Sequence, residues 1–170
     1  MPWINSGEVN KFRITEPTEY ISELGFERSA AKLLPHRTTV LAITGATLGQ
    51  VSLTEIGVTA NQSVVGLVSG PRLEPEFVYF WVREVIDEIV ARQTGGAQQH
   101  INKGNVEEQM VLVPCRTLLD AWTDIVRPMF DRIAASCFES TALQETRDYL
   151  LPRLMSGDVR VVSATPKSEG

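Results

Sequence analysis

The sequence predicts an α+β protein, in which a small mixed α/β domain is followed by a long C-terminal helix that forms a coiled coil. Three observations predict this class. Short β-branched runs between glycine-bearing turns indicate a small sheet, an amphipathic stretch indicates a helix packed on it, and heptad spacing indicates the long helix. With 170 residues, 43% of them hydrophobic, the chain can bury a core of its own.

The first segment, residues 3–35, mixes short helical signals with helix breakers, so only short elements fit there. Residues 17–21 predict the start of a helix that Gly25 closes. Ser29 is placed to cap a further helical turn over residues 30–34.

The central segment predicts a sheet followed by a helix. Residues 39–43, 50–53 and 63–68 are β-branched runs and are expected to form strands. A helix is expected over residues 74–93, with Pro75 in its first turn. Its apolar residues recur at helical steps and are expected to be core: Phe77, Phe80, Trp81, Ile86 and Ile89.

A glycine- and amide-rich loop, residues 94–103, follows this helix and has no core pattern of its own. Such a loop is either simply solvated or binds something. No acidic residue occurs between Glu88 and Glu107, so the loop is locally basic although the net charge of the chain is −5. Residues 109–113 predict one more strand, and Pro114 marks the end of the first domain, residues 1–114.

From Leu118 onward the apolar residues follow a heptad, which predicts a helical region over residues 115–157. Two interpretations of Pro128 stay open, a kinked helix or two shorter helices. The helix is expected to end at residues 151–152, before a short strand and a disordered tail over residues 158–170. The a and d positions are Leu119, Trp122, Val126, Met129, Ile133, Ser136, Ser140, Leu143, Arg147 and Leu150.

This seam either packs onto the preceding domain or pairs with a partner helix. A helix of that length, rising about 1.5 Å per residue, outreaches a domain of this size, so pairing is expected. The residues expected at a dimer or subunit interface are Leu119, Trp122, Val126, Met129, Ile133, Leu143 and Leu150.

Other features exclude several classes of function. No apolar run approaches the length of a membrane span, and residues 1–5 lack the pattern of a signal peptide, so a cytoplasmic protein is expected. Cys115 and Cys137 are isolated and are interpreted as buried packing residues. His36 and His100 are far apart, with no nucleophile, metal or cofactor motif near them, so we expect neither an enzyme nor a bound cofactor or metal.

Five stretches together resemble one known family. They are residues 3–9 (WINSGEV), 44–49 (TGATLG), 60–63 (ANQS), 94–101 (TGGAQQHI) and 147–157 (RDYLLPRLMSG). In order and spacing they are similar to the signatures of the specificity subunits of type I restriction-modification systems. Each motif alone is weak, but five in register over nearly the whole chain are specific.

The resemblance implies a target recognition domain that reads one half of a split double-stranded DNA target, and a conserved helix that spaces it from a second such domain. Neither part is catalytic in this family, because separate modification and restriction subunits carry out methylation and cleavage. They bind through the conserved helices, and could supply much of the phosphate neutralisation that an acidic chain lacks.

Two departures from the family pattern qualify this expectation. A specificity subunit usually has two recognition domains and two helical regions, so this chain resembles a half-subunit or a fragment. It would form a homodimer with antiparallel helices, reading a palindromic split target, or pair with a second recognition half. The family also has a longer segment before the first motif, so the first strand and helix are expected to be missing. The alternative function is a truncated interaction protein that dimerises or binds the modification subunit without reading DNA.

Candidate DNA contacts follow from side-chain chemistry, because amides and cations have the donors and acceptors that match base edges and phosphates. The main candidates are in the amide-rich loop: Thr94, Gly95, Gly96, Gln98, Gln99, His100, Asn102 and Lys103. A second surface, or an ordinary hairpin turn, contains Thr44, Thr47 and Gln50. Phosphate contacts, or ordinary solvated charges, are Lys11, Arg13, Arg28, Lys32 and Arg37. Asn61 and Gln62 are expected to satisfy turn backbone.

Overall fold

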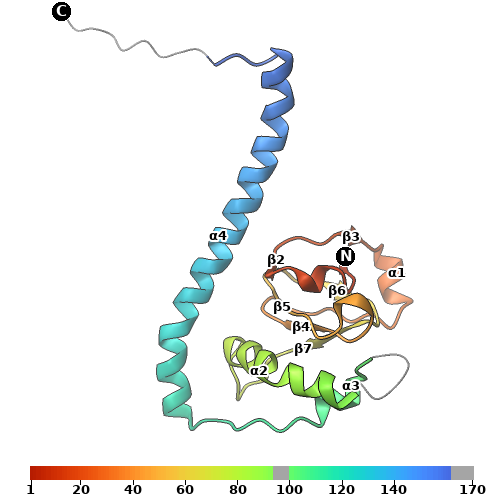
Figure 1. The fold of residues 1–170 in the computed structure, drawn as a ribbon, viewed down its shortest axis with the longest axis vertical. Helices are drawn as coiled ribbons and strands as arrows, with labels where there is room; N and C mark the ends of the chain where they lie inside the picture. Colours follow the sequence, from red (N-terminus) through yellow and green to blue (C-terminus); the bar gives the residue numbers. More distant parts are fainter. Residues whose placement is uncertain (94–99, 162–170) are drawn as a thin grey trace, which may run out of the picture. The chain divides into compact units, whose positions relative to one another are not determined.

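The computed structural model describes residues 1–93 and 100–161. The chain divides into two compact units, of which the first comprises residues 1–134 and the second begins at Ala135. The predicted α+β class is confirmed, because the first unit contains two small sheets with helices and a long helix, α4 (Arg116–Ser156), follows them (Figure 1).

A four-stranded sheet forms the centre of the first unit. Its order is β2-β5-β4-β7, where β5 is parallel to β2 and antiparallel to β4, and β4 is antiparallel to β7. The three predicted strand runs all lie in it. The strands are β2 (Arg13–Ile14), β4 (Thr39–Ala42), β5 (Val51–Thr54) and β7 (Val64–Leu67).

A second, three-stranded sheet contains the N-terminus. Its order is β3-β1-β6, with β1 antiparallel to β3 and parallel to β6. The strands are β1 (Pro2–Ile4), β3 (Glu19–Tyr20) and β6 (Thr59–Ala60). A short 3-10 turn, η1 (Glu8–Asn10), connects β1 to β2 and contributes Val9 to the core.

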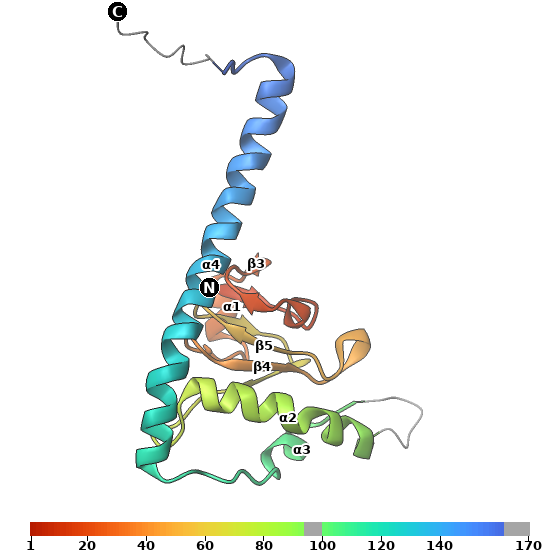
Figure 2. The ribbon, with the colours of Figure 1, turned by 60° about the vertical axis from the view of Figure 1, so that its left-hand side comes forward.

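The apolar run of β4 is continuous because both faces of the strand are covered. Val40 and Ala42 pack with Ile4, Val9 and Ile14 on the face of the small sheet and η1. Leu41 and Ile43 point to the opposite face, where they pack with Ile86 and Ile89 of α2 (Pro75–Gln93). Successive strand residues point to opposite sides, so a strand buried on both faces is apolar throughout. Figure 2 shows α2 crossing this face below β4 and β5.

Helix α2 has two apolar faces rather than the single one predicted. Ile86 and Ile89 face the sheet as expected. Val82 of the same helix is also buried in the core. Phe77 and Phe80 instead contact Trp122 of α4 edge-on, each with ring centroids 6.0 Å apart. Phe80 is 47% exposed, and Phe77 and Trp81 are half-buried, so the prediction that these three aromatics are core is wrong.

Helix α4 is continuous through Pro128, so the interpretation as two shorter helices is wrong. It also continues past residues 151–152 to Ser156, where Gly157 follows with φ +79°, the left-handed conformation that commonly terminates helices. The strand expected near the end of the chain does not form over residues 157–161. Among the described residues, no helix is long and apolar enough to span a membrane.

Two helical predictions in the first segment are wrong, because long-range backbone pairing displaces local propensity. Instead of starting a helix, residues 17–21 contain the strand β3, and Ile21 directly after this strand exchanges backbone hydrogen bonds with Met1. The helix starts later, as α1 (Glu23–Glu27), with Ser22 as its cap. Residues 30–34 are not helical, since Leu34 exchanges hydrogen bonds of 2.7 and 3.0 Å with Val58.

The strand predicted over residues 109–113 does not form, since this segment pairs with no strand among the described residues. Val111 and Val113 line a surface depression together with residues 70–73. The cysteine prediction is also wrong, since Cys115 is exposed and Cys137 is half-buried.

Candidate nucleic-acid interface

The turn between β4 and β5 forms the first candidate surface. It contains the 3-10 turn η2 (Gly45–Thr47), and Gly49 donates a 2.9 Å backbone hydrogen bond to Ala42 that closes it. Gly49 has φ +82°, and a side chain there would meet Val90 of α2 at 3.1 Å, so both conformation and space require glycine. The turn is thus seated against α2 and is more than a free hairpin loop.

The predicted contacts of this turn stay accessible. Gln50 is exposed, and Thr44 and Thr47 are half-buried. Thr44 precedes η2 without using its side chain to cap it. The apolar residue of the turn, Leu48, instead packs on the hydrophobic cluster that includes Ile86 and Ile89 of α2.

Most of the second candidate surface, residues 94–99, lies outside the described residues, and with it Thr94, Gly95, Gly96, Gln98 and Gln99. The described chain resumes at His100. His100 is exposed, whereas Ile101 is buried and donates a 2.9 Å backbone hydrogen bond to Ile43. The apolar anchor Ile101 was missed by sequence reasoning, because one isolated residue shows no periodicity.

Asn102 and Lys103 begin the short helix α3 (Lys103–Glu107). The backbone N–H of Asn105 donates to the side-chain oxygen of Asn102, and the backbone N–H of Asn102 donates to the side-chain oxygen of Asn105. Asn102 therefore caps the start of α3. Lys103 forms an exposed ion pair of 2.9 Å with Glu107. Exposed pairs contribute only about 0–1 kcal/mol, so Lys103 remains available to an anion.

The turn of residues 44–50 and the described part of the amide-rich loop are joined at one end of the four-stranded sheet. Ile43 leads directly into the turn, and its carbonyl accepts the hydrogen bond from Ile101, which comes directly after His100. Leu48 and Ile101 share one hydrophobic cluster. In Figure 2 the turn between β4 and β5 lies at the same end of the first unit as the C-terminal end of α2. Two segments that are far apart in the sequence are thus joined by one buried residue from each, Ile43 and Ile101.

Two of the five predicted phosphate contacts are wrong, because their guanidinium groups are used internally. Arg13 is buried between Phe12, Tyr79 and Phe130, each ring centroid 4.7 or 4.8 Å away. It also lies 3.2 Å from Glu55.

Arg37 bridges the start of α2 and the first half of α4. It pairs with Glu76 of α2 at 2.6 Å and with Asp131 of α4, and adopts φ 61°. The other three predicted contacts, Lys11, Arg28 and Lys32, are exposed.

The Arg13–Glu55 pair yields a pH prediction. Burial raises the pKa of Glu55 above its ordinary value of 4.5, although Arg13 and Arg37 oppose the shift. A carboxyl group whose pKa is higher in the folded than in the unfolded protein stabilises the fold fully at pH values below its pKa in the unfolded protein. This stabilisation is lost as the pH rises through its pKa in the folded protein. We expect the stability of Glu55→Gln relative to the wild type to increase from about pH 4 to about pH 7. Urea unfolding at a series of pH values measures this, and parallel pH curves for the two proteins would contradict it.

The predicted interface residues of α4 divide into two groups. Leu119 is buried within the first unit, while Trp122 contacts α2 and Val126 packs beside Phe130 and Tyr79. For this part of the seam, packing onto the preceding domain is the arrangement found. Met129 and Leu143 are exposed, whereas Ile133 and Leu150 are half-buried. These four keep apolar surface that a partner could cover.

The amides of the third motif behave partly as expected. The side-chain oxygen of Asn61 accepts from the backbone of Ser63 at 3.1 Å and stabilises the turn before β7, whereas Gln62 is exposed. Among the described residues, no group of three histidine, cysteine or acidic residues is arranged to hold a metal ion.

The sequence comparisons assign the chain to a family. Residues 1–116 match the type I restriction modification DNA specificity domain, and the chain belongs to this family. It is similar to the specificity subunit of the MjaIX type I restriction enzyme of Methanocaldococcus jannaschii, with 24% identity over 164 residues, 95% of this chain and 38% of that protein. It is also similar to the HindI specificity subunit of Haemophilus influenzae, with 24% identity over 153 residues, 88% of this chain and 33% of that protein.

A solved structure confirms the resemblance at the level of the fold. It comes from work on complex assembly and conformational transition of the type I restriction-modification system, and superposes with a TM-score of 0.58 at 12% identity. The match covers 94% of this chain and 39% of that chain. The chain thus spans between 33% and 38% of the length of the two relatives.

Proposed function

We propose that this chain is a non-catalytic DNA-recognition module that reads one half of a split DNA target and binds the methyltransferase and restriction subunits of a type I restriction-modification system. The observation that carries this proposal is the Ile43–Ile101 hydrogen bond, which joins the start of the polar turn of residues 44–50 to the C-terminal part of the amide-rich loop. Family membership and the specificity subunits among its relatives support DNA as the ligand.

The base-reading side chains in this proposal are amides. Glutamine can donate to and accept from adenine at once, and lysine can donate to guanine, so Gln98, Gln99 and Lys103 make the specific contacts. Gln50 approaches from the neighbouring turn. The glycines of the loop let the backbone come close to a phosphate, and hydroxyl and imidazole groups add further bonds. These supporting residues are Thr44, Thr47, Thr94, Gly95, Gly96 and His100.

Assembly through α4 completes the proposal. The seam positions of the second unit, Leu143 and Leu150, would pair with the same positions of a second copy, or with the helix of a second recognition half. Exposure of Leu143 and the heptad spacing support this pairing. Two identical recognition domains related by a twofold axis would read a palindromic split target.

The decisive experiment is selection from a random DNA pool by the full chain assembled with its modification subunit. We expect enrichment of one split motif. Replacing Gln98, Gln99 and Lys103 by alanine should weaken binding to that motif about a hundredfold or more, because each bidentate base contact contributes about 1–3 kcal/mol. The control replaces Gln144 and Arg72, which are exposed and belong to neither candidate surface, and should leave binding unchanged.

The alternative function predicts a different result. An interaction protein that only dimerises or binds the modification subunit would still co-purify with that subunit but would enrich no motif. That outcome would reject DNA reading and retain assembly.

A further inference from the structure

We propose that Lys11 and Arg83 form a phosphate-binding pair that holds the DNA backbone beside Gln50. This inference rests on the proposed DNA-binding function and extends it to the residues that set the position of the DNA. Sequence reasoning considered Lys11 among five cations and did not consider Arg83, because a lone arginine on the polar side of a helix gives no signal of its own.

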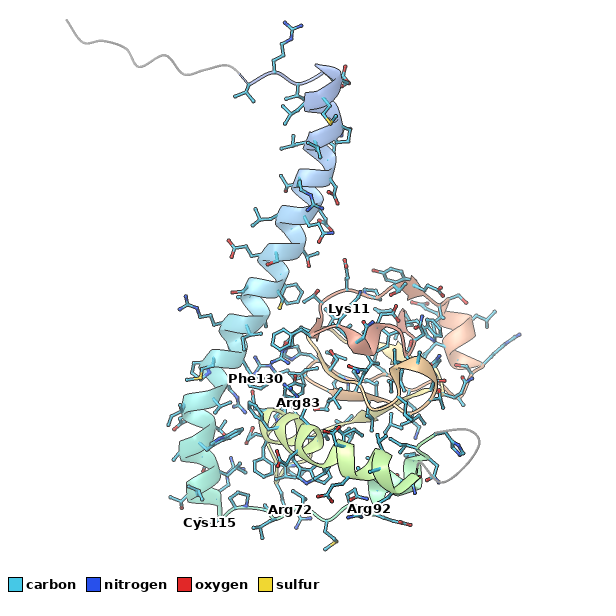
Figure 3. The ribbon with its side chains drawn as sticks, viewed as in Figure 1. Lys11, Arg72, Arg83, Arg92, Cys115 and Phe130 are labelled. Carbon is cyan, nitrogen blue, oxygen red and sulfur yellow. The ribbon has the colours of Figure 1, made fainter. Side chains whose placement is uncertain are left out.

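The two cations lie at one depression in the surface of the first unit. It has a volume of about 290 Å³ and is formed by three separate segments: the end of η1, the turn after β4, and the middle of α2. Its polar lining residues are Asn10, Lys11, Gln50, Arg83 and Asp87. Both cations are labelled in Figure 3, where their side chains belong to the part of the first unit around η1 and α2.

Ion pairs within the chain distinguish these two cations from several other basic residues. Arg13, Arg37, Arg116 and Arg127 all form ion pairs with carboxylates. In the part of the chain that the structure describes, neither Lys11 nor Arg83 forms one. Both therefore keep their full charge and donors for a ligand.

Arg83 is also held in place without losing its donors. Its guanidinium lies over the ring of Tyr79, 5.7 Å from the ring centroid, and Tyr79 is buried. Stacking on an aromatic face orients a guanidinium while leaving its N–H groups at the edge. The planar group can then bind two oxygens of a phosphate, and Lys11 adds a point charge.

One acidic residue opposes the pair. Asp87 lines the same depression, so the net charge of its lining is reduced to a single positive charge, from two cations and one anion. Removing the Asp87 charge should therefore strengthen phosphate binding. The change in affinity on removing the Asp87 charge is thus expected to be opposite in sign to the change on removing either cation.

The placement next to Gln50 gives the pair its role. Phosphate contacts fix the register of a protein on the duplex, and base contacts then specify the sequence. A phosphate held by Lys11 and Arg83 would be adjacent to an amide capable of reading a base edge. The pair should hence contribute affinity without contributing sequence preference.

The test uses the full chain assembled with its modification subunit, and duplexes with the selected motif and with a scrambled motif. We expect K11A/R83A to weaken binding to both duplexes about equally, by about tenfold or more near physiological salt. The slope of log affinity against log salt should become shallower by about 0.9, because the two cations together hold one phosphate and each lost phosphate contact removes about 0.9. D87N should strengthen binding to both duplexes.

The matched control is R72A/R132A, which removes the same total charge from exposed cations outside this depression. It should change affinity and salt slope much less. The proposal is overturned if K11A/R83A behaves like this control, or if only the selected duplex is affected. If the wild-type assembly binds neither duplex, the proposed function fails with it, whereas specific binding that is insensitive to K11A/R83A overturns the phosphate pair alone.

Discussion

Glu76→Gln is expected to lower the free energy of unfolding by about 3 kcal/mol, the largest loss we expect from any single charge in the chain. Glu76 is fully buried at the start of α2, where Arg37 lies 2.6 Å and Arg127 lies 3.3 Å from its carboxylate. Removing one partner of a buried pair leaves the remaining charge uncompensated, which costs about 3–5 kcal/mol. The lower end applies because Arg37 keeps Asp131 and Arg127 keeps Glu74.

The same substitution should loosen the start of α4. Hydrogen bonds from Arg127 to Glu76 of α2 and to Glu74 just before it connect α4 to the start of α2, and these bonds raise the pKa of Arg127. Trp122 lies in the same junction and contacts Phe77 and Phe80, so its fluorescence during urea unfolding follows the junction once Trp3 and Trp81 are replaced by phenylalanine in both proteins.

The matched control is Glu88→Gln, which removes the exposed pair with Arg92 and should cost only about 0.3–0.5 kcal/mol. Equal losses for the two variants would show that the buried network does not hold α4.

Charge substitution at Leu143 and Leu150 is expected to abolish self-association if the seam of the second unit pairs as proposed. Each leucine buried in a dimer contributes about 1.5–3 kcal/mol, and 1.4 kcal/mol is a factor of ten in affinity. L143E/L150E should therefore raise the dissociation constant at least about a hundredfold, because two seam positions are lost from both helices. Sedimentation or light scattering across a range of protein concentrations measures the change.

The structure improves the choice of positions for this test. Val126 packs with Phe130 and Tyr79 inside the first unit, so a charge there would destabilise the fold itself. Leu143 is 62% exposed and can be changed without that cost. The control is Phe138→Glu, which is 42% exposed at heptad position f, away from the seam. A wild-type monomer at high concentration, or equal effects of the seam and control substitutions, would exclude pairing through this seam.

The local sequence pattern was sufficient to predict the main strands and the two long helices. The runs at residues 39–43, 50–53 and 63–68 became strands, and residues 74–93 became α2, because β-branching and helical spacing act within each segment. The heptad likewise predicted α4, with Pro128 accommodated inside it.

The candidate site was predictable by residue type and only partly by position. Amides and cations in a glycine-rich loop indicated a polar surface, but charge alone could not separate a free cation from one used internally. Lys11 and Arg13 are two residues apart, yet Lys11 is exposed and Arg13 is buried beside Glu55. Which of them faces solvent depends on Tyr79 and Phe130, which come from distant parts of the chain.

The sequence by itself therefore determined the α+β class, the main strands and helices, and the family to which the chain belongs. Only the tertiary structure decided the rest, including the pairing of residues 17–21 as a strand, the contact of Ile43 with Ile101, and the internal use of Arg37. The physical reason is the range of the interactions. Propensity and periodicity act over one or two helical turns, whereas sheet pairing, burial and ion pairing join residues that the sequence keeps far apart.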